Sequence, residues 1–125
     1  MNNKVEKAKA IFWKSENGII HVKHLPNTHV NLEDSIEKLQ FIQELNGGPN
    51  ALVVSDPNAV ASISKEAKDL INTDLAQKTF KGLGIITTGY FTKYIFNFMI
   101  RLKTTSMSIK TFRNRSEAEH WLLRL

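Results

Sequence analysis

Three histidines near the start of the chain are the first residues whose types and spacing could do chemistry. His21, His24 and His29 fall within nine residues and are followed by Glu33 and Asp34. Imidazole and carboxylate groups are common ligands of transition metals, so a metal site is the chemistry to test. His21 and His24 are three residues apart, and in a strand this spacing places the two side chains on opposite faces. We therefore predict no metal site, and the sequence implies no other cofactor.

No other group of side chains has the pattern of a catalytic site. Gly82-Leu83-Gly84 precedes an expected strand, whereas the dinucleotide fingerprint needs its glycines after a strand and at the opening of a helix. The sequence holds no P-loop pattern, no Gly-x-Ser-x-Gly elbow and no cysteine. Because a nucleophile, a base and an orienting group cannot be assembled, we predict a binding protein rather than an enzyme.

Composition predicts one globular domain over residues 1–125, with 42% hydrophobic and 23% charged residues. The first seven residues are polar, and we expect them to be disordered. The N-terminus lacks the apolar core of a signal peptide, and no apolar run reaches the length of a membrane span. Lack of cysteine fits a reducing compartment. We therefore expect a cytoplasmic protein with no transmembrane segment.

Charge is unevenly distributed along the chain. Residues 1–77 hold eight Lys/Arg and ten Asp/Glu, whereas residues 78–125 hold nine and two. A basic half can attract nucleic acid, anionic lipid or an acidic protein. The basic residues stand singly and do not alternate with aromatic residues on a sheet, so we do not expect nucleic-acid binding.

Hydrophobic periodicity gives the element order β-β-α-β-α-β-α-β-α. We expect strands at 10–13, 19–22, 51–54, 82–88 and 106–112, and helices at 31–46, 62–75, 90–103 and 116–125. Strands that alternate with helices imply parallel pairing with right-handed crossovers. The predicted fold class is α/β, with a mostly parallel, five-stranded mixed sheet covered by four helices.

Local signals support three of these boundaries. Asn17-Gly18 predicts a hairpin with a type I′ turn between the first two strands. Asn31 with Asp34 is a loose capping box for the first helix, and Ser116 with Glu119 is a second one for the last helix.

The segment ALVVSDPNAVASISKEAKDL, together with this topology, resembles the STAS domain of bacterial anti-sigma-factor antagonists, the SpoIIAA-like proteins. Asp56 stands at the expected strand end, Asn58 falls where the family often has Ser or Arg, and Val60 and Ile63 match its apolar positions. The C-terminal third is similar to an uncharacterised bacterial branch of STAS-like proteins. Its matching residues are Thr87, Phe96-Asn97-Phe98, Lys103, Lys110, Phe112, Glu117-Ala118 and Trp121-Leu122. The resemblance implies a STAS-like fold and a regulatory role through protein contacts.

The sequence departs from the family at its phosphorylation switch. Phosphorylated members begin the second helix with an Asp-Ser pair, which falls here on Ser64-Lys65. Lys65 then occupies the phosphoserine position, and Ala67 replaces the usual glycine. A phosphate on Ser62 or Ser64 would meet the positive end of the helix dipole. The alternative role of these serines is helix capping.

The expected helix at 90–103 is apolar on two sides. Phe96 and Ile100 lie opposite its main apolar stripe, near Lys93 and Lys103. Either a neighbouring element buries these two residues, or they form an interface for a second copy of the chain, a protein partner or an anionic membrane surface.

Two functional hypotheses follow. The first is a non-enzymatic binding or regulatory domain that contacts an unknown protein or itself as a homodimer. Its contact residues are Asp56, Asn58, Ser62, Ser64, Lys65, Lys93, Phe96, Ile100 and Lys103. The alternative is a small-molecule or lipid-binding domain with peripheral membrane contact.

Overall fold

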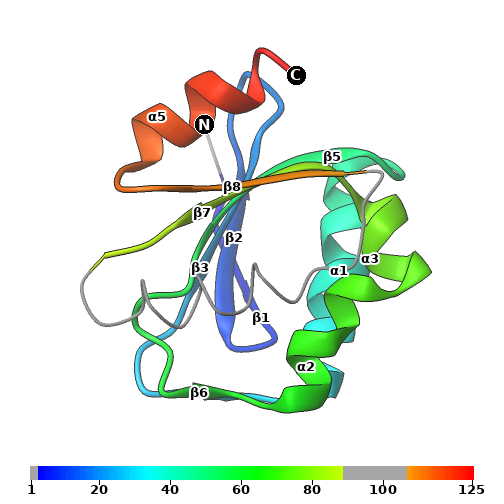
Figure 1. The fold of residues 1–125 in the computed structure, drawn as a ribbon, viewed down its shortest axis with the longest axis vertical. Helices are drawn as coiled ribbons and strands as arrows, with labels where there is room; N and C mark the ends of the chain where they lie inside the picture. Colours follow the sequence, from blue (N-terminus) through cyan, green and yellow to red (C-terminus); the bar gives the residue numbers. More distant parts are fainter. Residues whose placement is uncertain (1–2, 89–106) are drawn as a thin grey trace.

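A computed structural model of the protein describes residues 3–88 and 107–125. Its centre is a six-stranded sheet of order β1-β2-β3-β5-β7-β8 (Figure 1). The strands are β1 (Val5–Lys7), β2 (Ala10–Lys14), β3 (Ile20–His24), β5 (Ala51–Asp56), β7 (Phe80–Ile86) and β8 (Ser108–Phe112). The first three pair antiparallel, and β3, β5, β7 and β8 pair parallel. The α/β class and the mixed sheet are confirmed.

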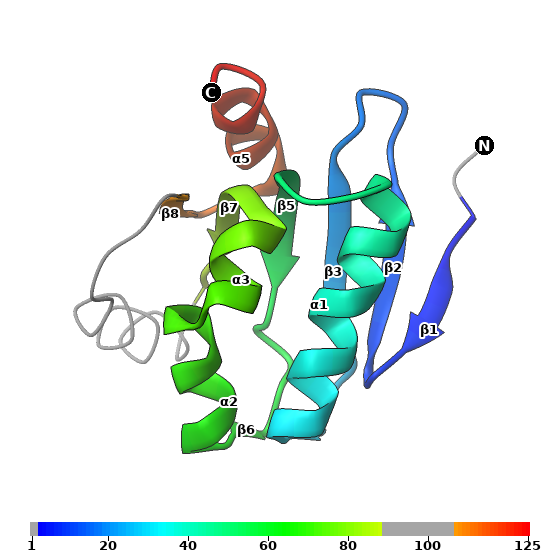
Figure 2. The ribbon, with the colours of Figure 1, turned by 90° about the vertical axis from the view of Figure 1, so that its right-hand side faces the viewer.

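The helices cover both faces of the sheet. On one face lie α1 (Leu32–Asn46), α2 (Lys65–Asp69), a 3₁₀ turn (Leu70–Asn72) and α3 (Asp74–Thr79); on the other lies α5 (Arg115–Leu122) (Figure 2). A short parallel ladder of β4 (His29–Val30) and β6 (Ser62–Ile63) ties the start of α1 to the start of α2. Among the described residues, no helix has the length and apolar character needed to cross a membrane.

The expected helix at 90–103 lies outside the described residues. The predictions for Lys93, Phe96, Ile100 and Lys103 fall there with it.

The sheet has one strand more than expected, because part of the segment predicted to be disordered forms β1. Val5 pairs with Phe12 and Lys7 with Ala10. Between them Ala8 and Lys9 both have positive φ, of 50° and 64°, as a type I′ turn requires. Of Asn17 and Gly18, where that turn was predicted, only Gly18 has positive φ, although the hairpin itself forms. Backbone pairing with β2 thus orders a segment that carries no apolar signal.

The second predicted helix is broken in two. Thr73 has extended backbone angles, and its side chain caps α3 by accepting a hydrogen bond from the Ala76 amide. A residue in this conformation cannot continue a helix, so α2 ends and α3 begins anew. The Thr73-Asp74 pair is a helix-start signal that the apolar periodicity of this segment concealed.

One of the two predicted capping boxes is present as expected. The Asn31 side chain accepts from the Asp34 amide at 2.9 Å, and Asp34 Oδ2 accepts from the Asn31 amide at 3.0 Å. The last helix is capped instead by Asn114, whose Oδ1 accepts from the Glu117 amide at 2.9 Å. It therefore begins at Arg115, two residues before the start that a Ser116 cap would give.

Two glycines let α5 approach the sheet closely. Gly82 and Gly84 lie inside β7, and a Cβ atom on Gly84 would stand 3.2 Å from the Ala118 Cβ. A Cβ on Gly82 would stand 2.8 Å from a methyl group of Leu122. Close helix packing, and not phosphate binding, is what these glycines provide.

Candidate ligand-binding cavity

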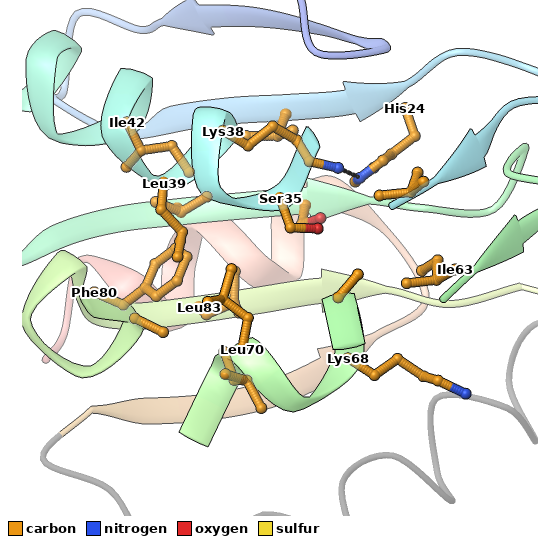
Figure 3. A pocket seen from close by; sticks show the side chains of 17 residues that line it. His24, Ser35, Lys38, Leu39, Ile42, Ile63, Lys68, Leu70, Phe80 and Leu83 are labelled. Atoms are coloured by element: carbon orange, nitrogen blue, oxygen red, sulfur yellow. Dashed lines mark hydrogen bonds between the residues drawn. The ribbon is translucent and has the colours of Figure 1, made fainter. Parts of the chain in front are cut away.

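A cavity of about 180 Å³ lies between the sheet and the helices α1, α2 and α3 (Figure 3). Its wall is mostly apolar and comes from elements far apart in the sequence. The labelled apolar residues are Leu39, Ile42, Ile63, Leu70, Phe80 and Leu83. A void of this size is larger than the roughly 150 Å³ engineered cavity that holds benzene. It has room for a small apolar molecule.

The polar groups of this cavity lie toward the carboxyl ends of β3 and β5. His24 is the last residue of β3, Ser55 lies near the end of β5, and Lys38 and Ser35 face them from α1. In open α/β sheets, ligands bind beside the carboxyl ends of the strands. The polar part of the cavity is therefore at the edge where ligand sites are common.

Lys38 is the most unusual residue of the cavity, because its side chain is charged at neutral pH in solution yet is only 8% exposed. Its Nζ donates a hydrogen bond to Nε2 of His24 at 2.8 Å, the dashed line in Figure 3. Burial lowers the pKa of the Lys38 ammonium to about 8, with a further lowering by Lys9, while Asp34 acts in the opposite direction. The fold therefore holds a cation where hydration is poor.

His24 is held in one neutral form. Its pKa is lowered to about 3, first by burial and second by the Lys38 charge. Nδ1 lies 3.3 Å from the carbonyl oxygen of Asp56, to which it donates, so Nε2 has a free lone pair for Lys38. His24 is thus an acceptor for the lysine and not a second cation.

Asp34 is the carboxylate that acts on Lys38, but it is engaged elsewhere. Its Oδ2 lies 2.8 Å from Lys9 Nζ and 3.0 Å from the Asn31 amide. Burial raises the pKa of Asp34, but the bonds from Asn31 and Lys9 outweigh this, and the pKa is lowered. Within residues 3–88 and 107–125, Lys38 makes no direct ion pair with a carboxylate.

Five of the predicted contact residues lie between the end of β5 and the start of α2, and Asn58 holds the loop after β5 in place. Its Nδ2 donates to Asp56 Oδ1 at 2.7 Å and to the Ile86 carbonyl at 2.9 Å. Its Oδ1 accepts from the Thr88 amide at 3.0 Å. Asp56 and Asn58 therefore join the ends of β5 and β7, and their polar atoms serve the fold.

Ser62, Ser64 and Lys65 have three different environments. Ser64 caps α2 by accepting from the Ala67 amide at 3.2 Å, the alternative weighed from the sequence. Lys65 is exposed at the first position of α2. Ser62 is exposed, and its Oγ lies 2.6 Å from His29 Nδ1. This serine–histidine contact has no carboxylate within ion-pair distance of the imidazole among the described residues, so a nucleophile–base–acid set is incomplete there.

The three histidines do not converge. His24 faces α1, whereas His21 lies on the opposite face of the sheet, as strand alternation predicts. His21 stacks on Trp13 with ring centroids 5.0 Å apart, and its Nδ1 accepts from Arg115 at 2.7 Å. Burial first and Arg115 second lower its pKa to about 4, so its imidazole is neutral at pH 7 and its 3.4 Å contact with Glu119 is not an ion pair.

Lys38 is a candidate site residue that was not predicted from the sequence. A signal for it exists, because Lys38 shares helical spacing with Ser35, Leu39 and Ile42, which line the same cavity. A lysine on the apolar face of an amphipathic helix is ordinarily assigned to the solvent boundary, where its long stem reaches water. Only the position of His24 shows that the amine points inward.

A family model described as "Domain of unknown function (DUF7793)" matches residues 12–125. Among solved structures, the fold is similar to an uncharacterised protein of the DUF3478 family from Shewanella loihica PV-4, which has a SpoIIAA-like fold. The TM-score is 0.61 at 18% identity, over 98% of this chain and 95% of the other. No curated protein matches the sequence. The comparison confirms the STAS-like fold that the sequence predicted.

Proposed function

The chain belongs to the DUF7793 family of domains of unknown function, and we propose that it is a non-catalytic domain that binds a small molecule in the cavity under α1 and α2. The cavity itself carries this proposal. The cavity measures about 180 Å³, opens to solvent and is lined mainly by aliphatic side chains. An apolar pocket with a few convergent polar groups is the usual form of a ligand site.

The absence of a complete reaction centre among the described residues supports binding over catalysis. The Asp56 carbonyl orients His24, but no described carboxylate lies within ion-pair distance of the Lys38–His24 pair. The Ser62–His29 contact lies on the surface, outside the cavity. Catalytic groups need a nucleophile or base held by an orienting partner beside the substrate. The apolar wall of the cavity and the charge of Lys38 are sufficient for binding a ligand.

A cavity-filling substitution tests the proposal. Ala67 is buried in the cavity wall, and Ala61 is exposed six residues earlier. Ala67→Leu fills the void, whereas Ala61→Leu adds the same atoms at the surface. At about 0.6 kcal/mol per non-hydrogen atom, an eight-atom probe such as hexanoate binds with a Kd of about 0.3 mM.

At 10 mM, such a probe would stabilise the wild type and Ala61→Leu by about 2 kcal/mol in urea unfolding, and would leave Ala67→Leu unchanged. The panel is hexanoate, 1-hexanol and toluene. If none of the three stabilises the wild type or shifts its amide resonances, the cavity is a packing defect and the proposal fails.

Protein contact through the loop after β5 is a second candidate function. Ser62 and Lys65 are exposed, and the loop that carries them is held by the hydrogen bonds of Asn58 and by the β4–β6 ladder. A surface that is already ordered loses little entropy on binding. The proposed surface also includes the other predicted contact residues, Lys93, Phe96, Ile100 and Lys103.

Charge reversal tests this second candidate. Lys65→Glu and Phe96→Asp should remove a partner captured from host cytosol, or convert a dimer to a monomer in sedimentation equilibrium. Lys78→Glu, which makes the same change on the exposed side of α3, should leave either association intact. Equal retention by all three variants would exclude this surface.

A further inference from the structure

Within the part of the chain that the structure describes, no carboxylate is in contact with the buried amine of Lys38. Of the described carboxylates, Asp34 is the one that acts on it, and Asp34 is already bound by Lys9 and the Asn31 amide. An ammonium group has three donors, and His24 Nε2 satisfies one. A buried charge that is neither paired nor fully hydrogen-bonded costs several kcal/mol. The site is therefore incomplete without a group that accepts the remaining donors and supplies negative charge.

Further donors lie in the same cavity. The Ser35 and Ser55 hydroxyls line it, and neither has a hydrogen-bond partner among the described residues. Figure 3 shows the Ser35 side chain between α1 and the sheet, in the space below the Lys38–His24 bond. The Lys38 ammonium and the two hydroxyls lie beside an apolar wall, so they can bind an acceptor group that is attached to a hydrocarbon body.

We propose that the ligand of this cavity is a small monocarboxylate, with its carboxylate on Lys38 and its apolar part against Leu39, Ile42 and Leu83. This inference rests on the proposed function and specifies the ligand class. The Lys38 ammonium with a neutral imidazole beside it balances one negative charge. The cavity is also lined by Lys68, but its Nζ is directed away from Lys38 (Figure 3), so a phosphate dianion on Lys38 would keep a second charge unpaired in a poorly hydrated site. A cavity of about 180 Å³ is similar in size to the engineered cavity of roughly 150 Å³ that holds benzene, so a body of about six carbon atoms fits it.

Matched ligands of equal length test the charge. Hexanoate, 1-hexanol and hexylamine differ in the head group alone, and their Kd values are measured at pH 7 by titration of amide resonances in the full-length protein. In the wild type we expect hexanoate to bind at least tenfold more tightly than 1-hexanol and hexylamine not to bind. Lys38→Met keeps the length of the side chain without its charge, and should bind 1-hexanol at least as tightly as hexanoate.

Lys38→Met removes the hydrogen-bond donor to His24 as well as the charge, so a lost preference could come from a folding defect. A second variant separates these two causes. Lys38→Gln keeps a donor at this position and should also lose the preference for hexanoate. Equal affinity of wild type for hexanoate and 1-hexanol, or an unchanged preference in both variants, would overturn the inference while leaving the proposed function standing. Binding of neither compound, nor of toluene, would refute the proposed function itself.

Discussion

The Nζ atom of Lys38 lies 2.8 Å from Nε2 of His24, and both side chains are buried between α1 and the sheet. The contact joins a helix to the end of a central strand through two basic residues. Both pKa values are lowered, to about 8 for Lys38 and about 3 for His24. Stability is therefore expected to depend on pH on both sides of neutrality.

On the alkaline side, the stability of the wild type should rise as the pH increases from 8 to 10.5. The folded-state pKa of Lys38 lies below its ordinary value of 10.5, so in this window the unfolded chain binds the additional proton. Stability then increases with pH, and the penalty of the buried charge is fully present below pH 8. The total change is about 3 kcal/mol.

The measurement is urea unfolding at pH 7.5, 9 and 10. The control variant is Lys38→Met, which leaves Asp34, Lys9 and His24 in place. Its stability should not rise between pH 8 and 10.5. Parallel pH curves for the two proteins would show that Lys38 keeps an ordinary pKa.

On the acidic side, stability should fall steeply below pH 6. His21 and His24 stay neutral in the folded state, with pKa values lowered to about 4 and about 3. The unfolded chain protonates both near pH 6.5, so near pH 5 the slope approaches about 2.5 kcal/mol per pH unit. His24→Gln should roughly halve this slope in unfolding experiments. A slope that does not change would mean that His24 is protonated in the native protein.

Gly84→Val should destabilise the fold by about 2 kcal/mol, because added carbon atoms meet the Ala118 Cβ and force α5 away from β7. The Ala118 Cβ is fixed to its helix backbone and cannot rotate away. Thr111→Val, which adds an apolar group at an exposed site on β8, should change stability little. Equal unfolding midpoints for the two variants would contradict the close packing of α5.

Asn58→Ala should cost about 2 kcal/mol, because the Asp56 carboxylate, the Ile86 carbonyl and the Thr88 amide lose their partner together. The neighbouring Ala59→Ser changes an exposed side chain and should have little effect. Differential scanning calorimetry measures both. Wild-type stability in Asn58→Ala would show that water replaces the amide without loss.

Local sequence determined most of the elements. Alternation and helical spacing gave the order of strands and helices, Asn31 with Asp34 marked the start of α1, and strand alternation separated His21 from His24. These features depend on residues within a few positions of one another, so they can be predicted from a single sequence.

The tertiary structure alone decided the features that join distant residues. Polar residues near the N-terminus became β1 because β2 offered an edge with unpaired backbone groups. Lys38 meets His24 across 14 positions, and Gly84 meets Ala118 across 34. Such contacts arise from how helices pack on the sheet, which periodicity does not encode. The candidate cavity therefore depends on packing, whereas the fold around it was largely readable from the chain.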